Sequence, residues 1–234
     1  MELNIHDMQF AVRRLPTDIR SLLSDYPDKL FVAGGFLRAV VAGETPSDID
    51  IFGISADVLN QAAKKLTERR GENTRLHKTK NALTVITSGR ITVQFITRWV
   101  FPTPTDCASS FDFTVCQAAV WRSGDGHYRS ICHDQFYRDL AARRLTYTVP
   151  TRDEEVGGSL MRVLKYVRRG YNIQADSLAA VVARLAFKVD GRADTEDRMH
   201  FVLRGLLKEV DPSIAVDGLD VHDDHETPIE GLVF

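Results

Sequence analysis

The sequence predicts an α+β fold in which a mixed sheet flanked by helices is followed by a small helical domain. Two observations carry this prediction. Short β-rich segments alternate with segments of helical periodicity through the first part of the chain. After Pro150 only helical periodicity remains, so the sheet is expected to end there. The expected divisions are a mixed domain at 1–150, a helical domain at 151–210 and an acidic, flexible tail at 211–234.

Helical periodicity in the first part of the chain predicts three helices. Pro16-Thr17-Asp18 opens the first of them, which is expected to end near Ser24, and Ser55 is the expected N-cap of the third. Apolar residues recur on one side of the third helix, as the amphipathic pattern of a packed helix requires. The expected helices span 16–24, 36–42 and 55–70.

Strands are predicted wherever apolar or alternating residues form short runs. Asp48–Phe52 alternates polar and apolar residues, which places both of its carboxylates on one face. Ser88-Gly89-Arg90 has the composition of a hairpin turn between two β-rich runs. The expected strands span 30–33, 48–52, 82–87, 91–97, 113–121 and 145–149. A helix at 134–144 precedes the last strand, and further helices are expected at 153–170, 176–188 and 195–209.

The composition is that of an ordinary soluble globular chain. Of its 234 residues 44% are hydrophobic, and 30 Lys and Arg nearly balance 32 Asp and Glu. The 3 cysteines form no C-x-x-C pair, which argues against a disulfide framework and a thiolate zinc site. The chain shows neither a membrane-length apolar run nor a signal-peptide pattern. We therefore expect a cytoplasmic protein with no membrane partner.

The segment Phe31–Phe52 combines a strand, a glycine pair, a helix start and a second strand with two carboxylates. Gly34 and Gly35 let the backbone approach a phosphate closely, and the following helix directs N–H groups and its positive dipole end at that anion. Asp48 and Asp50 lie one pleat apart, so their carboxylates can converge on a pair of Mg²⁺ ions. The segment therefore predicts a site for phosphoryl transfer from a nucleotide.

Asp112 and Arg38 are expected to complete this site. Asp112 stands at the mouth of the only long apolar strand, so it is a candidate third carboxylate that orients or activates an attacking hydroxyl. Arg38 is expected to contact a triphosphate or a backbone phosphate. Each feature alone has an ordinary explanation, since paired glycines often form turns and D-x-D is common at solvated strand edges. Their order along the chain favours the functional interpretation.

These motifs resemble those of the nucleotidyltransferases of the DNA polymerase β superfamily, above all the head and neck of class II CCA-adding enzymes and bacterial poly(A) polymerases. The glycine pair and D-x-D look like the GGxVRD and DxDI motifs of the family, and Asp112-Phe113-Thr114-Val115 looks like its DFTIN strand. Two later segments look like its DL…LR element and its RxLR…GF neck helix. The matching segments are 34–51, 112–115, 139–145 and 162–171.

The resemblance implies an enzyme that transfers a nucleoside monophosphate from an NTP such as ATP to an acceptor hydroxyl and releases pyrophosphate. The implied acceptor is an RNA 3′ end, plausibly tRNA-like, and the implied cofactor is Mg²⁺, for which Mn²⁺ can substitute. The implied catalytic and metal-binding residues are Asp48, Asp50 and Asp112. The implied nucleotide-binding residues in the head are Gly34, Gly35 and Arg38.

The helix at 153–170 adds a basic stripe to these candidates. Its apolar stripe is expected to face the core through Leu160, Val163, Leu164, Val167 and Tyr171. Arg162 and Lys165 are then candidates for nucleotide binding, and Arg162 matches the arginine of the neck motif. Weaker candidates for RNA binding are Arg143, Arg144 and Arg169.

The sequence also departs from the family pattern. The aspartate that follows GGxVR is Ala39 here, and the arginine pair ahead of the DFT motif is Ser110-Phe111. The acidic pair that precedes the neck arginine is Gly158-Ser159, so the protein template that selects C and then A is not intact. Because the remainder after Tyr171 is short, we expect less than a full CCA-adding enzyme.

These departures keep two alternatives open. The same chemistry can deliver the nucleotide to a protein or a small molecule, as toxin-like and antibiotic-modifying members of the superfamily do. A catalytically inactive module that binds nucleotide or RNA is the other alternative. The acceptor would be read by residues outside the motifs, so the motifs do not decide between these possibilities.

Overall fold

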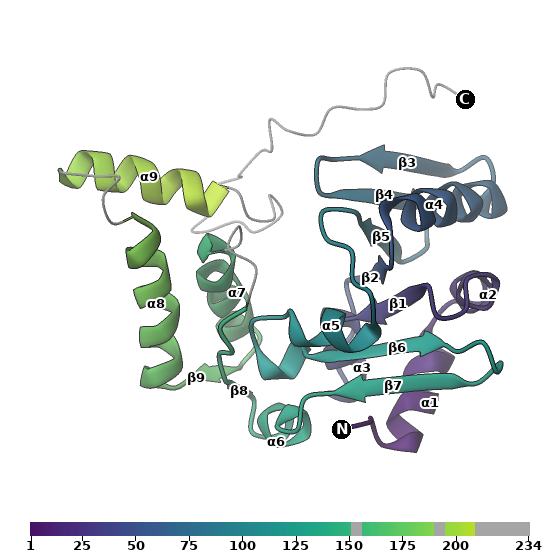
Figure 1. The fold of residues 1–234 in the computed structure, drawn as a ribbon, viewed down its shortest axis with the longest axis horizontal. Coiled ribbons are helices and arrows are strands. Elements are labelled where there is room, and N and C mark those ends of the chain that lie inside the picture. The colour runs from purple at the N-terminus through teal and green to yellow at the C-terminus, as the bar shows by residue number, and fades with distance from the viewer. Residues whose placement is uncertain (151–155, 190–194, 209–234) are drawn as a thin grey trace. The chain divides into compact units, whose positions relative to one another are not determined.

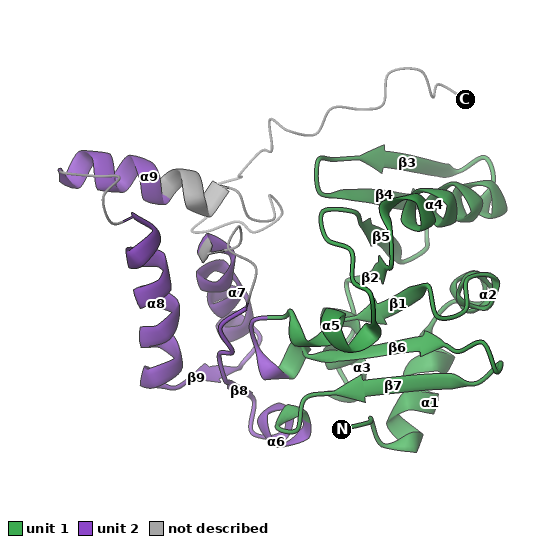
Figure 2. Cartoon of the chain, viewed as in Figure 1, with its two compact units in different colours: residues 1–111, 115–136, 225–234 green, residues 112–114, 137–224 purple. Residues whose placement is uncertain are grey.

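The computed structural model describes residues 1–150, 156–189 and 195–208, and Figure 1 shows their fold. These residues form two compact units, coloured separately in Figure 2. Among the described residues, unit 1 comprises 1–111 and 115–136, and unit 2 comprises 112–114, 137–150, 156–189 and 195–208. The predicted tail at 211–234 lies outside the described residues.

A seven-stranded mixed sheet is the framework of unit 1, as the α+β prediction requires. Its strands run in the spatial order β3-β4-β5-β2-β1-β6-β7, and only the β2–β5 pair is parallel. The strands are β1 (Leu30–Ala33), β2 (Asp48–Gly53), β3 (Thr74–Lys78), β4 (Ala82–Thr87), β5 (Thr92–Ile96), β6 (Ala118–Arg122) and β7 (Tyr128–Cys132).

The described part of unit 1 contains the helices α1 (Ile5–Arg14), α2 (Thr17–Asp25), α3 (Gly35–Val41), α4 (Ala56–Arg70) and α5 (Pro104–Ser109). Helix α4 packs on one sheet face, where Ile49, Ile51 and Phe95 are fully buried. Gly53 continues that row, and a Cβ atom there would lie 3.2 Å from the Leu59 side chain of α4. The alternate residues of β2, which include the two aspartates, therefore face the opposite side.

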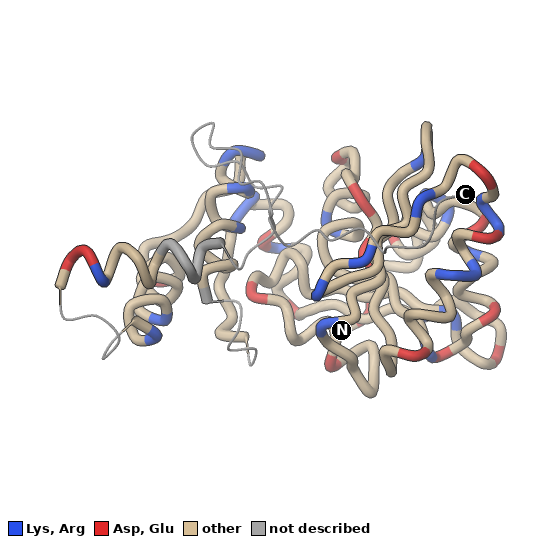
Figure 3. The backbone as a smooth tube through the Cα atoms, turned by 90° about the horizontal axis from the view of Figure 1, so that it is seen from above, with Lys and Arg blue, Asp and Glu red and all other residues tan. Residues whose placement is uncertain are grey.

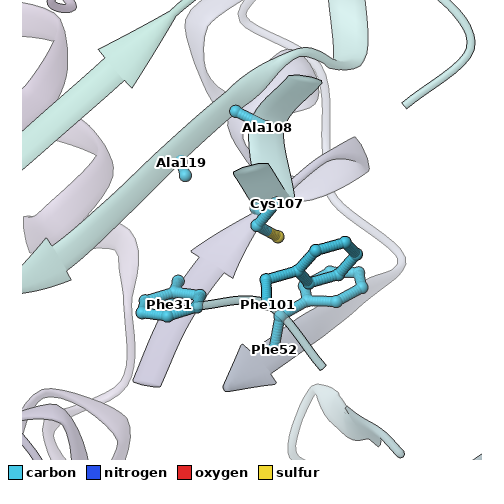
Figure 4. Close-up of a cluster of buried hydrophobic side chains, with 7 residues drawn as sticks. Phe31, Phe52, Phe101, Cys107, Ala108 and Ala119 are labelled. Atoms are coloured by element: carbon cyan, nitrogen blue, oxygen red, sulfur yellow. The ribbon is translucent and has the colours of Figure 1, made fainter. Parts of the chain in front are cut away.

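An aromatic cluster covers part of that opposite face (Figure 4). The ring of Phe52 packs against Phe101 with 6.0 Å between ring centroids, and Cys107 and Ala108 bring α5 onto the cluster. Phe31 adds the neighbouring strand β1. These buried side chains cover the sheet face beyond Asp50. The polar part of this face is therefore confined to the start of β2.

Most elements predicted in unit 1 are confirmed. The Ser55 hydroxyl accepts a hydrogen bond from the Val58 N–H at 3.2 Å and caps α4 as expected. The hairpin of β4 and β5 is also confirmed. Four elements in the described part of unit 1 were not predicted, namely α1, α5, β3 and β7.

The long strand predicted at 113–121 is wrong. Residues Thr114–Cys116 form a short 3₁₀ helix, and β6 begins only at Ala118. The cause is pairing with another segment, because the Thr114 N–H donates to Thr146 O at 3.1 Å and the Thr148 N–H donates to Asp112 O at 2.8 Å. Asp112 therefore does not open a sheet strand, and residues 112–114 belong to unit 2.

Unit 2 is mainly helical. It contains α7 (Val156–Arg168), α8 (Ala175–Val189) and α9 (Glu196–Lys208), with α6 (Phe136–Ala141) at its junction with unit 1. A two-residue parallel pair joins β8 (Arg144–Leu145) to β9 (Asn172–Ile173), so the expectation of no strand after Pro150 is wrong. This pairing draws residues ahead of Pro150 into unit 2, and the division falls between Phe136 and Tyr137.

The buried face of α7 differs from the predicted stripe. Val163 and Tyr171 are buried as expected, together with Met161 and Tyr166, which the prediction omitted. Leu164 and Val167 are 39% and 47% exposed, so the predicted core stripe is wrong at these two residues. Tyr166 replaces them because its ring packs against those of Phe113 and Tyr171. None of the helices in the described ranges is long and apolar enough to cross a membrane.

Candidate functional site

The two aspartates of β2 lie at the start of the strand, on the face that α4 leaves uncovered. In the sheet register, Asp48 lies opposite Thr92 and Asp50 lies opposite Gln94 of β5. Both aspartates are partly exposed. The Ser47 hydroxyl donates to Asp48 Oδ1 at 2.7 Å, and Asp48 forms no ion pair with any described residue. Two accessible carboxylates on one strand face are suited to bind a cation.

The glycine pair lies beside these carboxylates. Val32 is opposite Ile51, so the next residues of β1 run past the start of β2, and Gly34 follows β1 directly. Gly34 has a φ of 78° and is the N-cap of α3. A Cβ atom there would lie 2.7 Å from the Phe111 ring, so this position requires glycine both for its backbone and for its neighbour.

Gly35 differs from Gly34 in its surroundings. A Cβ atom at Gly35 would meet nothing within 4 Å, so packing alone does not require glycine there. No side chain caps the N-terminus of α3. The backbone at Gly35 therefore borders open space next to the carboxylate pair, and this is the space that a phosphate approaching the loop would need.

Arg38 lies in the interior of unit 1. It is 1% exposed, and its Nη1 donates to Glu44 Oε2 at 2.6 Å. Glu44 itself is held by a bond from its N–H to Ala39 O at 2.8 Å. Arg38 therefore secures the loop between α3 and β2 in this structure, and a phosphate contact would require this ion pair to open.

Phe111 is a site residue that the sequence analysis treated only as a departure from the family pattern. Its ring packs edge-on against Phe52 at a centroid distance of 5.6 Å and covers Gly34. Its backbone carbonyl accepts a hydrogen bond from Gln117 Nε2 at 2.7 Å. The signal available in the sequence was an aromatic residue beside a motif aspartate, but only the fold shows that it contacts the glycine loop.

The third predicted carboxylate lies in unit 2 and is engaged there. Asp112 is 3% exposed, and its Oδ2 accepts a hydrogen bond from Arg162 Nε at 2.7 Å. A Cβ atom at Gly158 would lie 3.0 Å from the Arg162 guanidinium, so Gly158 leaves the room in which this side chain lies. The structure thus brings together two predicted site residues, Asp112 and Arg162, as partners of one another.

The other basic candidates of unit 2 fall into two groups. Arg144 pairs through Nε and Nη2 with Asp139, and Arg143 stacks over the Tyr171 ring and donates to Arg169 O at 3.1 Å. These contacts give Arg143 and Arg144 a structural function. Lys165 is partly exposed and Arg169 is exposed, so both remain accessible to a ligand.

Asp139, the partner of Arg144, is fully buried. Burial raises the pKa of its carboxyl, but hydrogen bonds from Thr114, Arg144 and Thr146 outweigh that effect, and the pKa is held below its ordinary value. The Thr114 hydroxyl donates to Asp139 Oδ2 at 2.7 Å. Asp139 thus remains charged inside unit 2 and joins the 112–114 segment to α6.

The residues of unit 1 fit Mg²⁺ better than a metal that prefers nitrogen or sulfur ligands. Within the described ranges, no group of three or more His, Cys, Asp and Glu side chains is arranged to hold a metal ion. Mg²⁺ is nevertheless commonly bound by one or two carboxylates together with substrate phosphates and water. Asp48 and Asp50 supply that donor set without a third protein carboxylate.

Several solved CCA-adding enzymes are similar to this chain in fold. A Thermotoga maritima CCA-adding enzyme complexed with tRNA is 18% identical, with a TM-score of 0.56 over 89% of this chain and 50% of the enzyme. A CCA-adding enzyme with CTP is also 18% identical, with a TM-score of 0.56 over 91% of this chain and 51% of that one. One with ATP is 20% identical, with a TM-score of 0.54 over 87% and 50%. The predicted resemblance is confirmed for the fold, and this chain spans about half the length of those enzymes.

The chain therefore has a nucleotidyltransferase-like fold. A family model described as Gabija anti-defense 2 (Gad2) family protein matches residues 8–143, which is more than half of the chain. The chain belongs to the Gabija anti-defense 2 family. A search of curated proteins returned no match.

Proposed function

We propose that this protein is a metal-dependent nucleotidyltransferase that transfers a nucleoside monophosphate from an NTP to an acceptor hydroxyl and releases pyrophosphate. The observation that carries the proposal is the pair of accessible carboxylates, Asp48 and Asp50, beside the glycine loop at Gly34 and Gly35. The fold shared with CCA-adding enzymes supports the reaction class.

The residues of unit 1 would bind the metal ion and the triphosphate in this reaction. Asp48 and Asp50 would hold Mg²⁺ or Mn²⁺, which when bound neutralises phosphate charge and lowers the pKa of a coordinated hydroxyl. Gly34 and Gly35 leave the backbone close to the triphosphate, whose negative charge the N-terminus of α3 favours. Phe111 shields the loop from water on one side, which strengthens electrostatic interactions within the site.

The proposal assigns unit 2 to substrate binding. Lys165 and Arg169 are the accessible basic residues of the predicted set. Arg162 would bind the substrate either after it leaves Asp112 or while it is still bonded to Asp112. Asp112 remains a proposed third carboxylate, which would likewise have to leave Arg162 in order to bind a metal ion. Arg38, Arg143 and Arg144 are the weaker ligand candidates, because each is engaged in contacts that stabilise its own unit.

The favoured acceptor is an RNA 3′ end, because a structural neighbour is complexed with tRNA. A second candidate acceptor is a protein or a small molecule, and the family name favours it, since an anti-defense protein is expected to act on a component of a defense system. We propose a cytoplasmic location for either reaction, in keeping with the three free, buried cysteines.

The test is a labelling experiment with a matched control. The protein is incubated with Mg²⁺, each α-labelled NTP in turn and total small RNA, and the labelled species are separated into RNA, protein and small molecules. The inactive reference is Asp48→Asn/Asp50→Asn. Asp125→Asn serves as the control, because Asp125 is an exposed aspartate of unit 1 that pairs with Arg129 far along the chain from β2.

Each outcome has a distinct meaning. Label on RNA that disappears in the double variant but persists in Asp125→Asn supports the RNA nucleotidyltransferase and identifies its nucleotide. Label on protein or on a small molecule with the same dependence supports the second acceptor. Label that survives loss of both β2 carboxylates rejects the proposed site. Tight NTP binding without transfer to any acceptor favours the non-enzymatic binding module.

A further inference from the structure

Unit 1 contains a second candidate binding site where the N-terminus of α2 meets the start of β5. A pocket of about 470 Å³ is present there, lined by Pro16, Thr17, Asp18, Arg90 and Ile91. Pro16 is the N-cap of α2 and provides no side-chain cap, while Asp18 in the first turn accepts the Ile19 N–H. The pocket walls therefore combine a helix N-terminus with an arginine from the turn between β4 and β5.

The charged residues at this pocket do not balance. Asp18 Oδ2 accepts hydrogen bonds from both Arg70 Nε at 2.8 Å and Arg90 Nη1 at 3.2 Å. Its Oδ1 accepts a bond from the Ile19 N–H at 2.9 Å, so both of its oxygens are engaged. Two guanidinium groups share one carboxylate, and neither has another ion pair in the part of the chain that the structure describes. The cluster therefore carries a net positive charge.

The two arginines differ in a way that suits a binding site. The Arg70 side chain is 0% exposed, and its Nη2 has no hydrogen-bond partner in the described ranges. Its Nη1 reaches Thr87 Oγ1 at 3.3 Å and Ile91 O at 3.4 Å, which are long contacts. Arg70 thus fixes an incompletely satisfied positive charge behind the pocket wall. Arg90 is 53% exposed and lines the pocket, so it can bind a ligand.

The pocket lies at the same end of the sheet as the carboxylate pair. Ile91 directly precedes Thr92, which is the register partner of Asp48. Adjacent strands are separated by about 4.8 Å, so the start of β5 is the immediate neighbour of the start of β2. The glycine loop flanks the same strand on its β1 side. The pocket borders the sheet face that α4 covers, because Asp18 bonds Arg70 of α4, whereas Asp48 lies at the same end on the opposite face.

We propose that this pocket binds a phosphate group and that Arg90 is its principal ligand. The ligand class is a phosphate ester of a nucleotide or of a polynucleotide strand. Only the source of the phosphate rests on the proposed function: because the glycine loop takes the NTP, the acceptor strand supplies the phosphate at Arg90. Figure 3 shows basic and acidic residues interspersed over unit 1, so individual arginines, rather than a broad basic patch, must provide such contacts.

The test measures binding in the absence of catalysis. Asp48→Asn/Asp50→Asn is used as the background in buffer with a metal chelator, so that the carboxylate pair contributes nothing. A fluorescently labelled single-stranded RNA and inorganic triphosphate are titrated separately at several salt concentrations. Arg90→Gln is compared with Arg129→Gln, a matched control in which an arginine of unit 1 with 51% exposure also pairs with one aspartate. Thermal unfolding checks that both variants fold.

The proposal predicts that Arg90→Gln weakens RNA binding about tenfold and lowers the salt dependence by about one counterion, while Arg129→Gln changes neither. Weakening of triphosphate binding instead would support the phosphate site and assign it to the nucleotide. Unchanged binding of both ligands, or equal losses for the two variants, would overturn it. A protein that transfers no nucleotide but shows the Arg90 dependence would reject the proposed function alone.

Discussion

Aspartates serve opposite purposes in the two units. In unit 1, Asp48 and Asp50 are partly exposed on β2, and Asp48 is bonded to a neutral hydroxyl. In unit 2, Asp112 and Asp139 are 3% and 0% exposed, and each is paired with an arginine. The same side chain is therefore available to a ligand in one unit and already compensated in the other.

The two environments differ in the free-energy cost of binding a metal ion. A carboxylate that is already paired inside a protein must lose its arginine before it can bind a metal, and breaking a buried pair costs about 3–5 kcal/mol. Asp48 is partly exposed and forms no ion pair with any described residue, so it has no arginine to lose. Retained motif residues are therefore not equivalent, and the partly exposed carboxylates of β2 are the ones that we propose to bind the metal.

The largest expected effect is on the β2 pair. Asp50→Asn preserves the shape of the side chain but removes a metal-binding charge, so we expect nucleotide transfer to fall by about 10³-fold, the scale of several kcal/mol of transition-state stabilisation. Stability should change by less than about 1 kcal/mol, because the side chain is not fully buried. Steady-state transfer rates and urea unfolding measure the two effects, and wild-type rates in this variant would contradict the comparison.

The next effect belongs to the buried acid of unit 2. Asp139→Asn leaves Arg144 and Thr114 without a charged acceptor, so we expect a loss of about 3 kcal/mol in the free energy of unfolding at neutral pH. Because the folded-state pKa of Asp139 is lowered, its stabilisation is present above the ordinary carboxyl pKa near ~4 and disappears as the pH falls through the folded-state value. Urea unfolding as a function of pH should therefore show a weaker acid dependence in the variant.

Asp125→Asn provides the control for that measurement. Backbone hydrogen bonding from His127 and a side-chain bond from Arg129 lower the pKa of Asp125 to about 2, but this pair lies at the surface. Solvent screens such a pair, so its loss should affect stability less than Asp139→Asn. Equal losses in the two variants would mean that burial does not set the value of these aspartates.

The sequence predicted the parts of the site that depend on local order along the chain. Gly34 and Gly35 follow β1, and Asp48 and Asp50 alternate on β2, because a strand, a turn and a short period each leave a pattern within a few residues. The α+β class and the helical character of unit 2 followed from the same patterns.

The parts that escaped prediction depend on which segments meet in space. The 112–114 segment looked like the start of a strand, but it pairs with 146–148. Arg38 looked like a phosphate ligand, and no local pattern shows that its guanidinium is buried against Glu44. Phe111 contacts Gly34 from about 80 residues away, which no periodicity reports.

A smaller effect tests the link between the two predicted ligands of unit 2. Asp112→Asn and Arg162→Gln should each destabilise the protein, and the double variant should lose less than the sum, with a coupling energy of about 1–2 kcal/mol. Arg162 is 24% exposed, which places this coupling below the cost of a fully buried pair. A double-mutant cycle by urea unfolding measures it. Additive losses would show that the ion pair contributes nothing and that Asp112 is as available as the β2 pair.

The smallest expected effect on stability is at Gly35, and it sharpens the contrast between open and filled space. Gly35→Ala adds a methyl group that meets nothing within 4 Å at the first turn of α3, so the free energy of unfolding should rise by about 0.5 kcal/mol or stay unchanged. The same methyl group occupies the space that we assign to the triphosphate, so the KM for the NTP should rise. Gly34→Ala, in contrast, should destabilise the fold, because its Cβ would collide with Phe111. An unchanged KM in stably folded Gly35→Ala would place the triphosphate elsewhere.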